Sequence, residues 1–341
     1  MKTDDILFLT GNQIIDLFKG REKDIMDVVK RAYQVHAKGD SALPHSSFLR
    51  FPNSDRNRII ALPAYLGGDF STAGIKWIAS FPGNLDKNLE RASAALILND
   101  LETGRPKAIM ESSVISSSRT AASASLAADC LQGSQTIESV GLIGCGLINY
   151  ETFRFLYVAR PDIENVYLYD INTDRAEQFR QKCQGLSDQL KITIVSSVDQ
   201  VFQNAWITAL ATTAVKPHIN DISSCRPGSI ILHTSLRDLT PEVILSADNI
   251  ADDIDHICRA QTSVHIAEQT VGNRQFIRCA IGDIFNGVMK PRPLKDKVAI
   301  FSPFGLGILD LAVAELACKL SAENECGMLL PSFFPIPWIQ R

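Results

Sequence analysis

The stretch at residues 138–150 (ESVGLIGCGLINY) constrains the fold of this chain more than any other. A short apolar run there leads into two closely spaced glycines, Gly144 and Gly146, and then into a helical pattern. This order predicts a β-strand, a tight turn and a helix start. Glycine suits a backbone that turns sharply and lets a pyrophosphate approach the N–H groups at the positive end of the helix. The third position of the usual G-x-G-x-x-G pattern is Asn149, so the turn alone is a weak signal.

A second apolar run, at residues 166–169, ends at Asp170, which stands 24 residues after Gly146. A carboxylate at this distance accepts hydrogen bonds from the ribose hydroxyls of an adenine dinucleotide and repels the 2′-phosphate of NADP. The pair of signals therefore favours NAD as the cofactor. The alternative is an ordinary turn between a strand and a helix, with a solvated aspartate at the end of the strand.

Strand-like and helix-like segments alternate after residue 140. Such alternation predicts an α/β fold, a Rossmann-type doubly wound parallel sheet with helices on both faces. The expected strands lie at 140–143, 166–169, 191–195, 206–211, 229–233 and 249–252, and helices begin near residues 147 and 173.

The remainder of the chain predicts a second domain of α+β type. Helical patterns at residues 11–38 precede strand-like runs at 47–50, 58–63, 73–78, 94–98 and 106–110. Residues 112–128, rich in serine and alanine, form a connecting helix, and residues 308–320 form an amphipathic helix that returns to the first domain. We expect residues 1–126 with 308–341 to form the substrate-binding and dimerisation domain, and residues 127–307 the NAD-binding domain.

Composition narrows the classes of function. A chain of 341 residues that is 45% hydrophobic is long enough for two domains with sizeable cores. Its net charge of −4 and the lack of a basic patch argue against nucleic-acid binding. We expect no signal peptide, no membrane anchor and a cytoplasmic location. The eight cysteines show no C-x-x-C spacing, so we expect reduced thiols and no metal site.

Several cations stand at unusual places in the first domain. Arg50 ends an apolar run, Lys76 lies within a strand between Ile75 and Trp77, and Arg119 interrupts a helix of small residues. A cation on a mostly buried element needs an anion, because an unpaired one costs several kcal/mol. One interpretation is that these residues form separate structural ion pairs, or that their side chains reach solvent. The other is that they form a shared site for substrate carboxylates beside the nicotinamide. Arg91 is a possible fourth member.

Four motifs in order carry a family resemblance that spans nearly the whole chain. They are residues 74–84 (GIKWIASFPGN), 98–106 (LNDLETGRP), 118–122 (SRTAA) and 144–146 (GCG). The sequence resembles the ornithine cyclodeaminase and mu-crystallin family. Within it, residues 74–78, 88–93 (NLERAS), 97–100 and 142–148 are most similar to the N-(2-amino-2-carboxyethyl)-L-glutamate dehydrogenases of 2,3-diaminopropionate biosynthesis, as in staphyloferrin B pathways.

The resemblance implies a homodimer and a two-part active site. It implies that the substrate is bound by Arg50, Lys76, Arg91 and Arg119. It implies that the cofactor is bound along Arg119, Thr120, Gly144, Gly146, Leu147, Ile148, Asp170, Thr212 and Ser235. Neither nucleic acid nor a membrane is an expected partner.

The implied reaction is the NAD-dependent oxidation of a secondary amine that joins two amino acids. Loss of hydride from the glutamate α-carbon leaves an imine, which water converts to 2-oxoglutarate and 2,3-diaminopropionate. Lys76 and Asp238 are the candidate catalytic residues, with Asp238 as the general base. The alternative interpretation is that Asp238 is an exposed acid on a loop. His233, at a strand end, is a second candidate base or a structural histidine.

One departure from the family pattern separates this chain from the cyclodeaminases. Their catalytic aspartate lies six residues before a glutamate, and counting back from Glu242 reaches Leu236. Arg91 also stands where a threonine of the cofactor site is expected, which suits a substrate with additional carboxylates. Two other readings stay open: an ornithine cyclodeaminase or amino-acid or imine dehydrogenase of the same family, and a non-catalytic ligand-binding protein of the mu-crystallin type.

Overall fold

The computed structural model describes residues 5–133, 136–292, 294 and 296–340. Its contacts divide the chain into two units: unit 1 consists of residues 1–119 and 306–341, and unit 2 of residues 120–305. The first division falls inside helix α3 (Ser113–Gln132), which corresponds to the expected connecting helix. The boundaries expected from the sequence were at 126/127 and 307/308.

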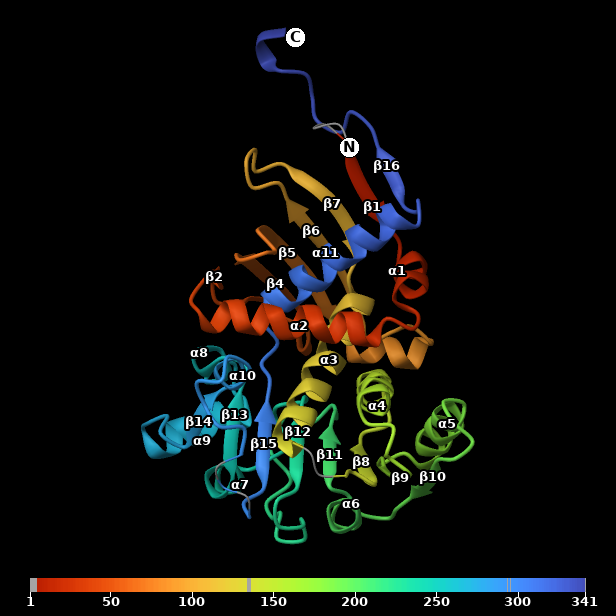
Figure 1. The fold of residues 1–341 in the computed structure, drawn as a ribbon, viewed down its shortest axis with the longest axis vertical. Helices are drawn as coiled ribbons and strands as arrows, with labels where there is room; N and C mark the ends of the chain where they lie inside the picture. The colour runs from red at the N-terminus through yellow and green to blue at the C-terminus, as the bar shows by residue number, and fades with distance from the viewer. Residues whose placement is uncertain (1–4, 134–135, 293, 295, 341) are drawn as a thin grey trace. The chain divides into compact units, whose positions relative to one another are not determined.

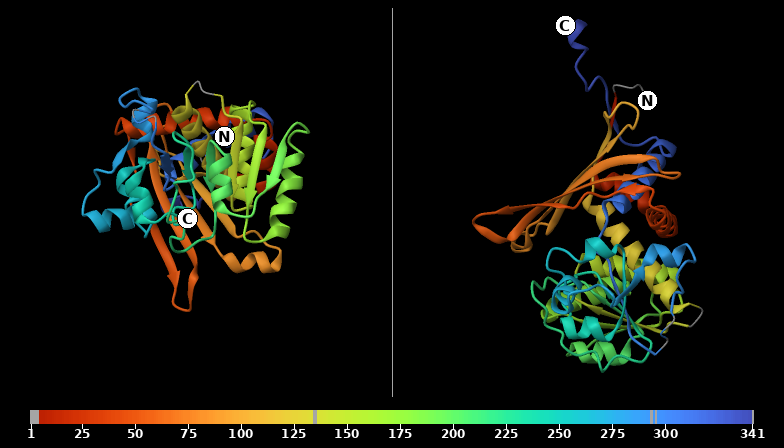
Figure 2. Two further views of the ribbon diagram at one scale, coloured as in Figure 1. Left: turned by 90° about the horizontal axis from the view of Figure 1, so that it is seen from below. Right: turned by 90° about the vertical axis from the view of Figure 1, so that its left-hand side faces the viewer.

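Unit 2 contains an eight-stranded sheet in which every strand pair is parallel, as the alternating pattern predicted. The order along the sheet is β10 (Lys191–Ile194), β9 (Asn165–Tyr169), β8 (Ser139–Ile143), β11 (Ile207–Leu210), β12 (Ile230–His233), β15 (Ala299–Ser302), β13 (Asp248–Ala251) and β14 (Ile277–Ala280). The central strands are buried along their whole length, because helices cover both faces (Figures 1 and 2).

The helices of unit 2 follow the strands in the manner of a doubly wound fold. They are α4 (Leu147–Ala159), α5 (Thr173–Gln184), α6 (Val198–Asn204), α7 (Pro241–Ser246), α8 (Ile254–Ile257), α9 (Ser263–Val271) and α10 (Ile281–Phe285). The chain runs outward from β8 to β10, then returns to the other side of β8 with β11. The strand order therefore reverses between β8 and β11, and ligands of such sheets bind at the carboxyl ends of the strands beside this point.

Unit 1 is built on a mixed sheet whose central strands are antiparallel. Its order is β16 (Met328–Leu330), β1 (Ile6–Leu9), β7 (Pro106–Glu111), β6 (Ala92–Asn99), β5 (Thr72–Ser80), β4 (Ser54–Leu66) and β2 (Ser41–Ala42), with β3 (Ser47–Phe51) also paired to β4. The unit also contains α1 (Gly11–Phe18), α2 (Glu22–Ala37) and the short 3-10 helices η1 (Pro82–Lys87) and η2 (Trp338–Gln340). The α/β class with a parallel-sheet domain and an α+β domain is confirmed.

Helix α11 (Gly307–Glu323) packs against β4, β5 and β6, and α2 packs against α11 (Figure 1). The sequence predicted an amphipathic helix here, but α11 is buried on nearly all sides. The expectation was wrong because α11 packs on the sheet and is also contacted by α2 and α1. A buried acid on this helix, Asp310, therefore needs a partner.

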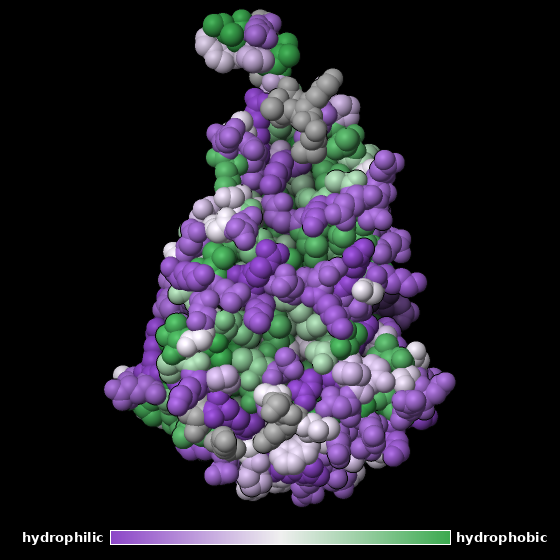
Figure 3. All heavy atoms as spheres, viewed as in Figure 1, coloured by the Kyte–Doolittle hydropathy of each residue, from purple (hydrophilic) through white to green (hydrophobic). Residues whose placement is uncertain are grey.

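The C-terminal segment after β16 leaves large apolar side chains in solvent (Figure 3). Trp338 is 81% exposed and Ile339 is 77% exposed. Among the residues that the structure describes, none of the helices is both long and apolar enough to cross a membrane.

Candidate functional site

The glycine turn joins β8 to α4 in unit 2 and has the geometry of a phosphate-binding turn. Gly144 has a φ of +91°, and a Cβ on it would lie 2.6 Å from the carbonyl oxygen of Ala211, so a side chain does not fit. Gly146 precedes α4 without a side-chain cap, and the space around its Cα is open. The first N–H groups of α4, from Leu147 and Ile148, therefore suit an anion.

Asn149 explains why the third glycine of the pattern is absent. Its side chain is fully buried, and its amide nitrogen donates to the carbonyl oxygens of Ile143 at 2.9 Å and Gly144 at 2.8 Å. The amide thus ties the start of α4 to the end of β8. Close approach of helix and strand is obtained here by hydrogen bonding rather than by the small size of glycine.

Asp170 lies beside the turn, as the spacing predicted. One carboxylate oxygen accepts the backbone N–H of Cys145 at 2.7 Å, and the other accepts that of Asn172 at 2.9 Å. Each oxygen keeps further acceptor capacity for ribose hydroxyls. Burial, with a contribution from Asp170, raises the pKa of the Cys145 thiol to about 12, so this cysteine is a neutral packing residue and not a nucleophile. The turn and the carboxylate together fit an adenine dinucleotide.

A second polar group, here called the Asp238 network, lies past the carboxyl ends of β11 and β12. Asp238 has no exposed surface, and its two oxygens accept hydrogen bonds from the hydroxyls of Thr212 and Ser235. His233 Nε2 lies 3.3 Å from Asp238 Oδ2, and His233 Nδ1 lies 3.4 Å from the hydroxyl of Ser302. The expectation of an exposed loop acid is wrong, because these partners bury the carboxylate completely.

The electrostatics of Asp238 do not favour a general base. Burial acts to raise its pKa, but the hydrogen bonds from His233, Ser235 and Thr212 outweigh burial and lower the pKa to about 2. A carboxylate with so low a pKa holds a transferred proton poorly at neutral pH. The geometry instead favours a carboxylate that holds the loops after β11 and β12 in place.

Unit 1 contains a buried charge cluster, the Lys76 cluster, made of Lys76, Arg119, Ser116 and Asp310. The Lys76 Nζ donates to Asp310 Oδ2 at 2.7 Å and to the hydroxyl of Ser116 at 3.1 Å. The Nε of Arg119 donates to Asp310 Oδ1 at 3.2 Å. Three elements, β5, α3 and α11, thus bring two predicted cations to one carboxylate. Burial lowers the pKa of Lys76 to about 8, against the opposing effect of Asp310.

Arg50 and Arg91 lie elsewhere in the sheet. Arg50 of β3 pairs with Arg58 of β4, and Arg58 pairs with Ser80 of β5. Ser80 in turn pairs with the first residue of β6, which Arg91 directly precedes. Ser80 is four residues from Lys76 along β5, about 13 Å at the rise of a strand. Burial lowers the pKa of the Arg91 guanidinium, whereas Arg50 is exposed and lies over the Phe48 ring. The structure therefore joins Lys76 and Arg119 in one cluster and places Arg50 and Arg91 outside it.

The remaining predicted residue, Thr120, follows Arg119 in α3 and is half-buried. Sequence reasoning missed Asp310, Ser116, Ser302 and Arg58. Asp310 had a signal, since it is a single acid within an apolar stretch of helix. The two serines and Arg58 had none, because their roles depend on strand register and helix packing. Among the described residues, the structure groups no three metal-ligating side chains.

Comparison with known proteins agrees with this geometry. N-((2S)-2-amino-2-carboxyethyl)-L-glutamate dehydrogenase of Staphylococcus aureus is 27% identical over 332 residues, covering 96% of this chain and 98% of that protein. Alanine dehydrogenase of Archaeoglobus fulgidus is 28% identical over 346 residues, covering 96% and 99%.

Solved structures show the same fold. The Thermococcus litoralis Delta(1)-pyrroline-2-carboxylate reductase, in complex with NADH and L-proline, superposes with a TM-score of 0.87 at 24% identity, covering 95% of this chain and 99% of that chain. An archaeal alanine dehydrogenase dimer with bound NAD gives a TM-score of 0.85 at 25% identity, covering 97% and 100%. Residues 16–322 match the sequence model of the ornithine cyclodeaminase/mu-crystallin family, and this protein therefore belongs to that family.

Proposed function

We propose that this protein is an NAD-dependent dehydrogenase that oxidises a C–N bond of an amino-acid substrate, and that the substrate is N-(2-amino-2-carboxyethyl)-L-glutamate. The products are then 2-oxoglutarate and L-2,3-diaminopropionate, the second of which supplies a siderophore or another secondary metabolite. The observation that carries the proposal is the Lys76 cluster, in which two buried cations share one carboxylate.

The charge balance of the Lys76 cluster supports an anionic substrate group. Lys76 and Arg119 carry two positive charges when Lys76 is protonated, and Asp310 supplies one negative charge. A buried site with excess positive charge is stabilised by a further anion, and an amino-acid carboxylate provides it with hydrogen-bonding capacity as well.

Cations outside the Lys76 cluster support a substrate with more than one carboxylate. Arg50 and Arg58 face each other across β3 and β4, and Arg91 directly precedes β6, whose first residue pairs with Ser80 in the same row. Like charges opposite each other in a sheet are destabilising. A ligand with distal carboxylates is attracted to the exposed Arg50, whereas the distal ammonium of ornithine is repelled by it.

The residues of this chain fit the proposed chemistry in separate roles. NAD held at Gly144, Gly146 and Asp170 supplies the hydride acceptor. Lys76 and Arg119 orient the substrate carboxylate. With a pKa of about 8, Lys76 is mostly a cation at neutral pH and binds the carboxylate in that form. Only its neutral fraction, which grows as the pH rises toward 8, takes a proton from the substrate amine, whereas Asp238 with a pKa of about 2 holds such a proton poorly.

The runner-up is a dehydrogenase of a smaller amino or imino acid in the same family, which the 28% identity to alanine dehydrogenase favours. Cyclisation of ornithine is disfavoured by Leu236, which is buried and offers no acid at the expected place. A ligand-binding protein without activity is the third reading.

A substrate panel separates these readings. Purified protein with NAD is mixed in turn with the conjugate, alanine, proline and ornithine, and reduced nicotinamide is followed by absorbance. The proposal predicts the highest kcat/KM with the conjugate. A higher value with alanine or proline supports the runner-up, and no turnover of any compound supports the binding protein.

We also propose that the functional form is a homodimer, which the dimeric archaeal alanine dehydrogenase supports. One face of the unit 1 sheet packs on α11, and its residues, such as Leu62, Lys76 and Leu96, are buried. The opposite face carries Ala61, Trp77 and Ala95 in one row and Pro63, Ile75 and Ile97 in the next. In the described part of unit 1, α1 and α2 pack on α11 (Figure 2), so the opposite apolar face suits a second copy.

A further inference from the structure

The Asp238 network fixes the direction of two hydroxyl hydrogen bonds. A hydroxyl has one proton to donate and two lone pairs that accept, whereas a carboxylate only accepts. The hydroxyls of Thr212 and Ser235 both donate to Asp238. The other neighbour of the Ser235 hydroxyl is the carbonyl oxygen of Leu210 at 3.0 Å, which is again an acceptor. Both protons are therefore committed inside the protein.

The two hydroxyls have only oxygen lone pairs left for hydrogen bonds to a ligand. The oxygen of Thr212 accepts the backbone N–H of Ala214 at 3.1 Å and keeps one lone pair. The Ser235 oxygen keeps two, since its described hydrogen bonds use only its proton. Both residues are half-buried, so their surfaces are not closed off. A ligand that meets them must therefore supply hydrogen-bond donors.

The sheet register places the two hydroxyls as neighbours at the ligand-binding edge. Leu210 at the end of β11 pairs with His233 at the end of β12. Thr212 and Ser235 each stand two residues past this pair, at the carboxyl ends of adjacent parallel strands. The β8–β11 reversal, where dinucleotides bind in such sheets, lies next to them.

The loop that carries Ser235 and Asp238 is held in a strained shape. Leu236 has a φ of +67°, which a side chain with a Cβ adopts only under constraint. Its carbonyl oxygen accepts the N–H of Ser263 at 2.7 Å, and Arg237 donates to the carbonyl oxygen of Ala260 at 2.8 Å. These bonds and Asp238 fix the loop before any ligand arrives.

We propose that Asp238 is a positioning residue that makes Thr212 and Ser235 a pair of acceptors for the carboxamide N–H₂ group of the nicotinamide. Recognition of this group orients the ring and selects for the amide. The proposal rests on the proposed function only in that NAD is the cofactor; it does not depend on the identity of the amino-acid substrate.

Dinucleotide analogues test the proposal by calorimetry without any turnover. The thionicotinamide analogue keeps the N–H₂ group, and the 3-acetylpyridine analogue replaces it with a methyl group. The intact protein is expected to bind NAD and the thionicotinamide analogue within about threefold of each other, and the 3-acetylpyridine analogue about tenfold more weakly. Equal affinity for NAD and the 3-acetylpyridine analogue overturns the proposal.

The Asp238→Asn variant is expected to lose this discrimination. An amide at this position donates to one of the hydroxyls and frees its proton to point toward the ligand. NAD affinity should fall, and the ratio between NAD and the 3-acetylpyridine analogue should shrink to about threefold or less. A variant that keeps the tenfold ratio contradicts a positioning role.

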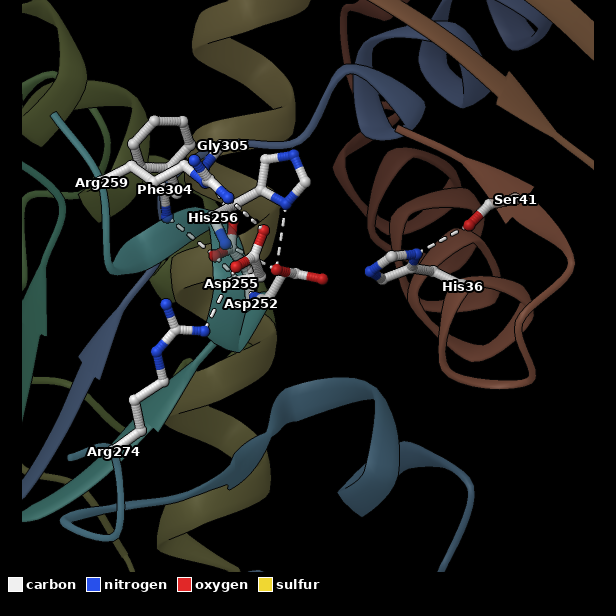
Figure 4. Close-up of polar contacts among 10 residues, drawn as sticks. His36, Ser41, Asp252, Asp255, His256, Arg259, Arg274, Phe304 and Gly305 are labelled. Carbon is white, nitrogen blue, oxygen red and sulfur yellow. Dashed lines mark hydrogen bonds and ion pairs between the residues drawn. The ribbon is translucent and has the colours of Figure 1, made fainter. Parts of the chain in front are cut away.

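Asp252→Asn is the matched control. Asp252 is another buried aspartate of unit 2, and it accepts the backbone N–H groups of Phe304 at 2.8 Å and Gly305 at 2.7 Å (Figure 4). This variant should melt earlier and keep the analogue ratio of the parent.

Ser235→Ala is the second test variant, in case Asp238→Asn does not fold. It removes an acceptor, so the affinity for NAD should fall several-fold while the affinity for the 3-acetylpyridine analogue stays the same. A fall of both affinities by the same factor overturns the proposal. A parent that binds NAD with the expected ratio but turns over no substrate refutes only the proposed reaction. A parent that binds none of the dinucleotides refutes both.

Discussion

At the scale of single residues, charge placement decides most of the chemistry. The sequence predicted that Lys76 and Arg119 need an anion, and the structure supplies it as Asp310. It also predicted the carboxylate of Asp170 beside the glycine turn. The role of Asp238 was not predictable, because its pKa depends on burial, on His233 and on two hydroxyls, of which that of Thr212 comes from a different loop.

The substrate clamp gives the first prediction. Replacing Lys76 or Arg119 by methionine should lower kcat/KM by roughly 2–4 kcal/mol of transition-state binding, because a charge-assisted contact in a desolvated site is lost. Lys107→Met is the control, since Lys107 also pairs with an acid on α11, Glu315, at 2.8 Å, but outside the cluster. Steady-state kinetics check the effect. Normal turnover by both cluster variants would place the site elsewhere.

The buried Lys76 also predicts a pH dependence of stability. Its pKa is about 8 in the folded protein and 10.5 in the unfolded chain, so between these values the unfolded chain binds more protons. Stability from this group therefore rises with pH in that window, by about 1 kcal/mol from pH 8 to pH 9. Denaturant unfolding of the parent and Lys76→Met at both pH values measures it. A constant difference between the two proteins would show that Lys76 is not desolvated as described.

Selectivity for NAD over NADP follows from Asp170. Asp170→Ser should lower the ratio of kcat/KM with NAD to kcat/KM with NADP about tenfold, because the repulsion between the carboxylate and a 2′-phosphate is lost. Asp174→Ser is a suitable control, since Asp174 lies in the first turn of α5 without a role in the turn after β8. The ratio of kcat/KM values for the two cofactors is the measurement. Equal use of both cofactors by the parent would refute this role of Asp170.

At the scale of elements, strands within the alternating strand and helix pattern were predictable, and several strands outside it were not. The parallel sheet of unit 2 was predicted from β8 to β13, because each of these strands is an apolar run bounded by turn residues. Strands β10 to β13 were predicted although they have only four residues each, so length does not explain why β1, β14, β15 and β16 were missed. Their pairing brings together segments far apart in the chain, such as β1 with β16, which no local pattern records.

The open face of the unit 1 sheet gives the prediction at this scale. Trp77 is 45% exposed at the centre of that face. Trp77→Glu should convert the dimer to a monomer, because it places a charge in an apolar contact, while the monomer keeps its secondary structure. Light scattering after gel filtration measures the mass. Leu101→Glu, at another exposed position of the same unit, should leave the dimer intact. An unchanged mass for Trp77→Glu would move the interface to another surface.

At the scale of the whole molecule, unit 2 contains the glycine turn and the Asp238 network, and unit 1 contains the Lys76 cluster. The family and the fold class could be predicted from the sequence, because four motifs of the family occur along the chain in the expected order. The choice of substrate is not fixed by the fold, since relatives with the same architecture act on different amino and imino acids. It depends on which substrate groups meet the cations of unit 1.

The central claim is that this chain oxidises and splits a conjugate of glutamate and diaminopropionate. The most direct measurement is the stoichiometry of products when the purified protein is given NAD and that conjugate. The account predicts 2-oxoglutarate, 2,3-diaminopropionate and reduced nicotinamide in equal amounts. Formation of proline and ammonia from ornithine at a comparable rate, with the conjugate left intact, would contradict it.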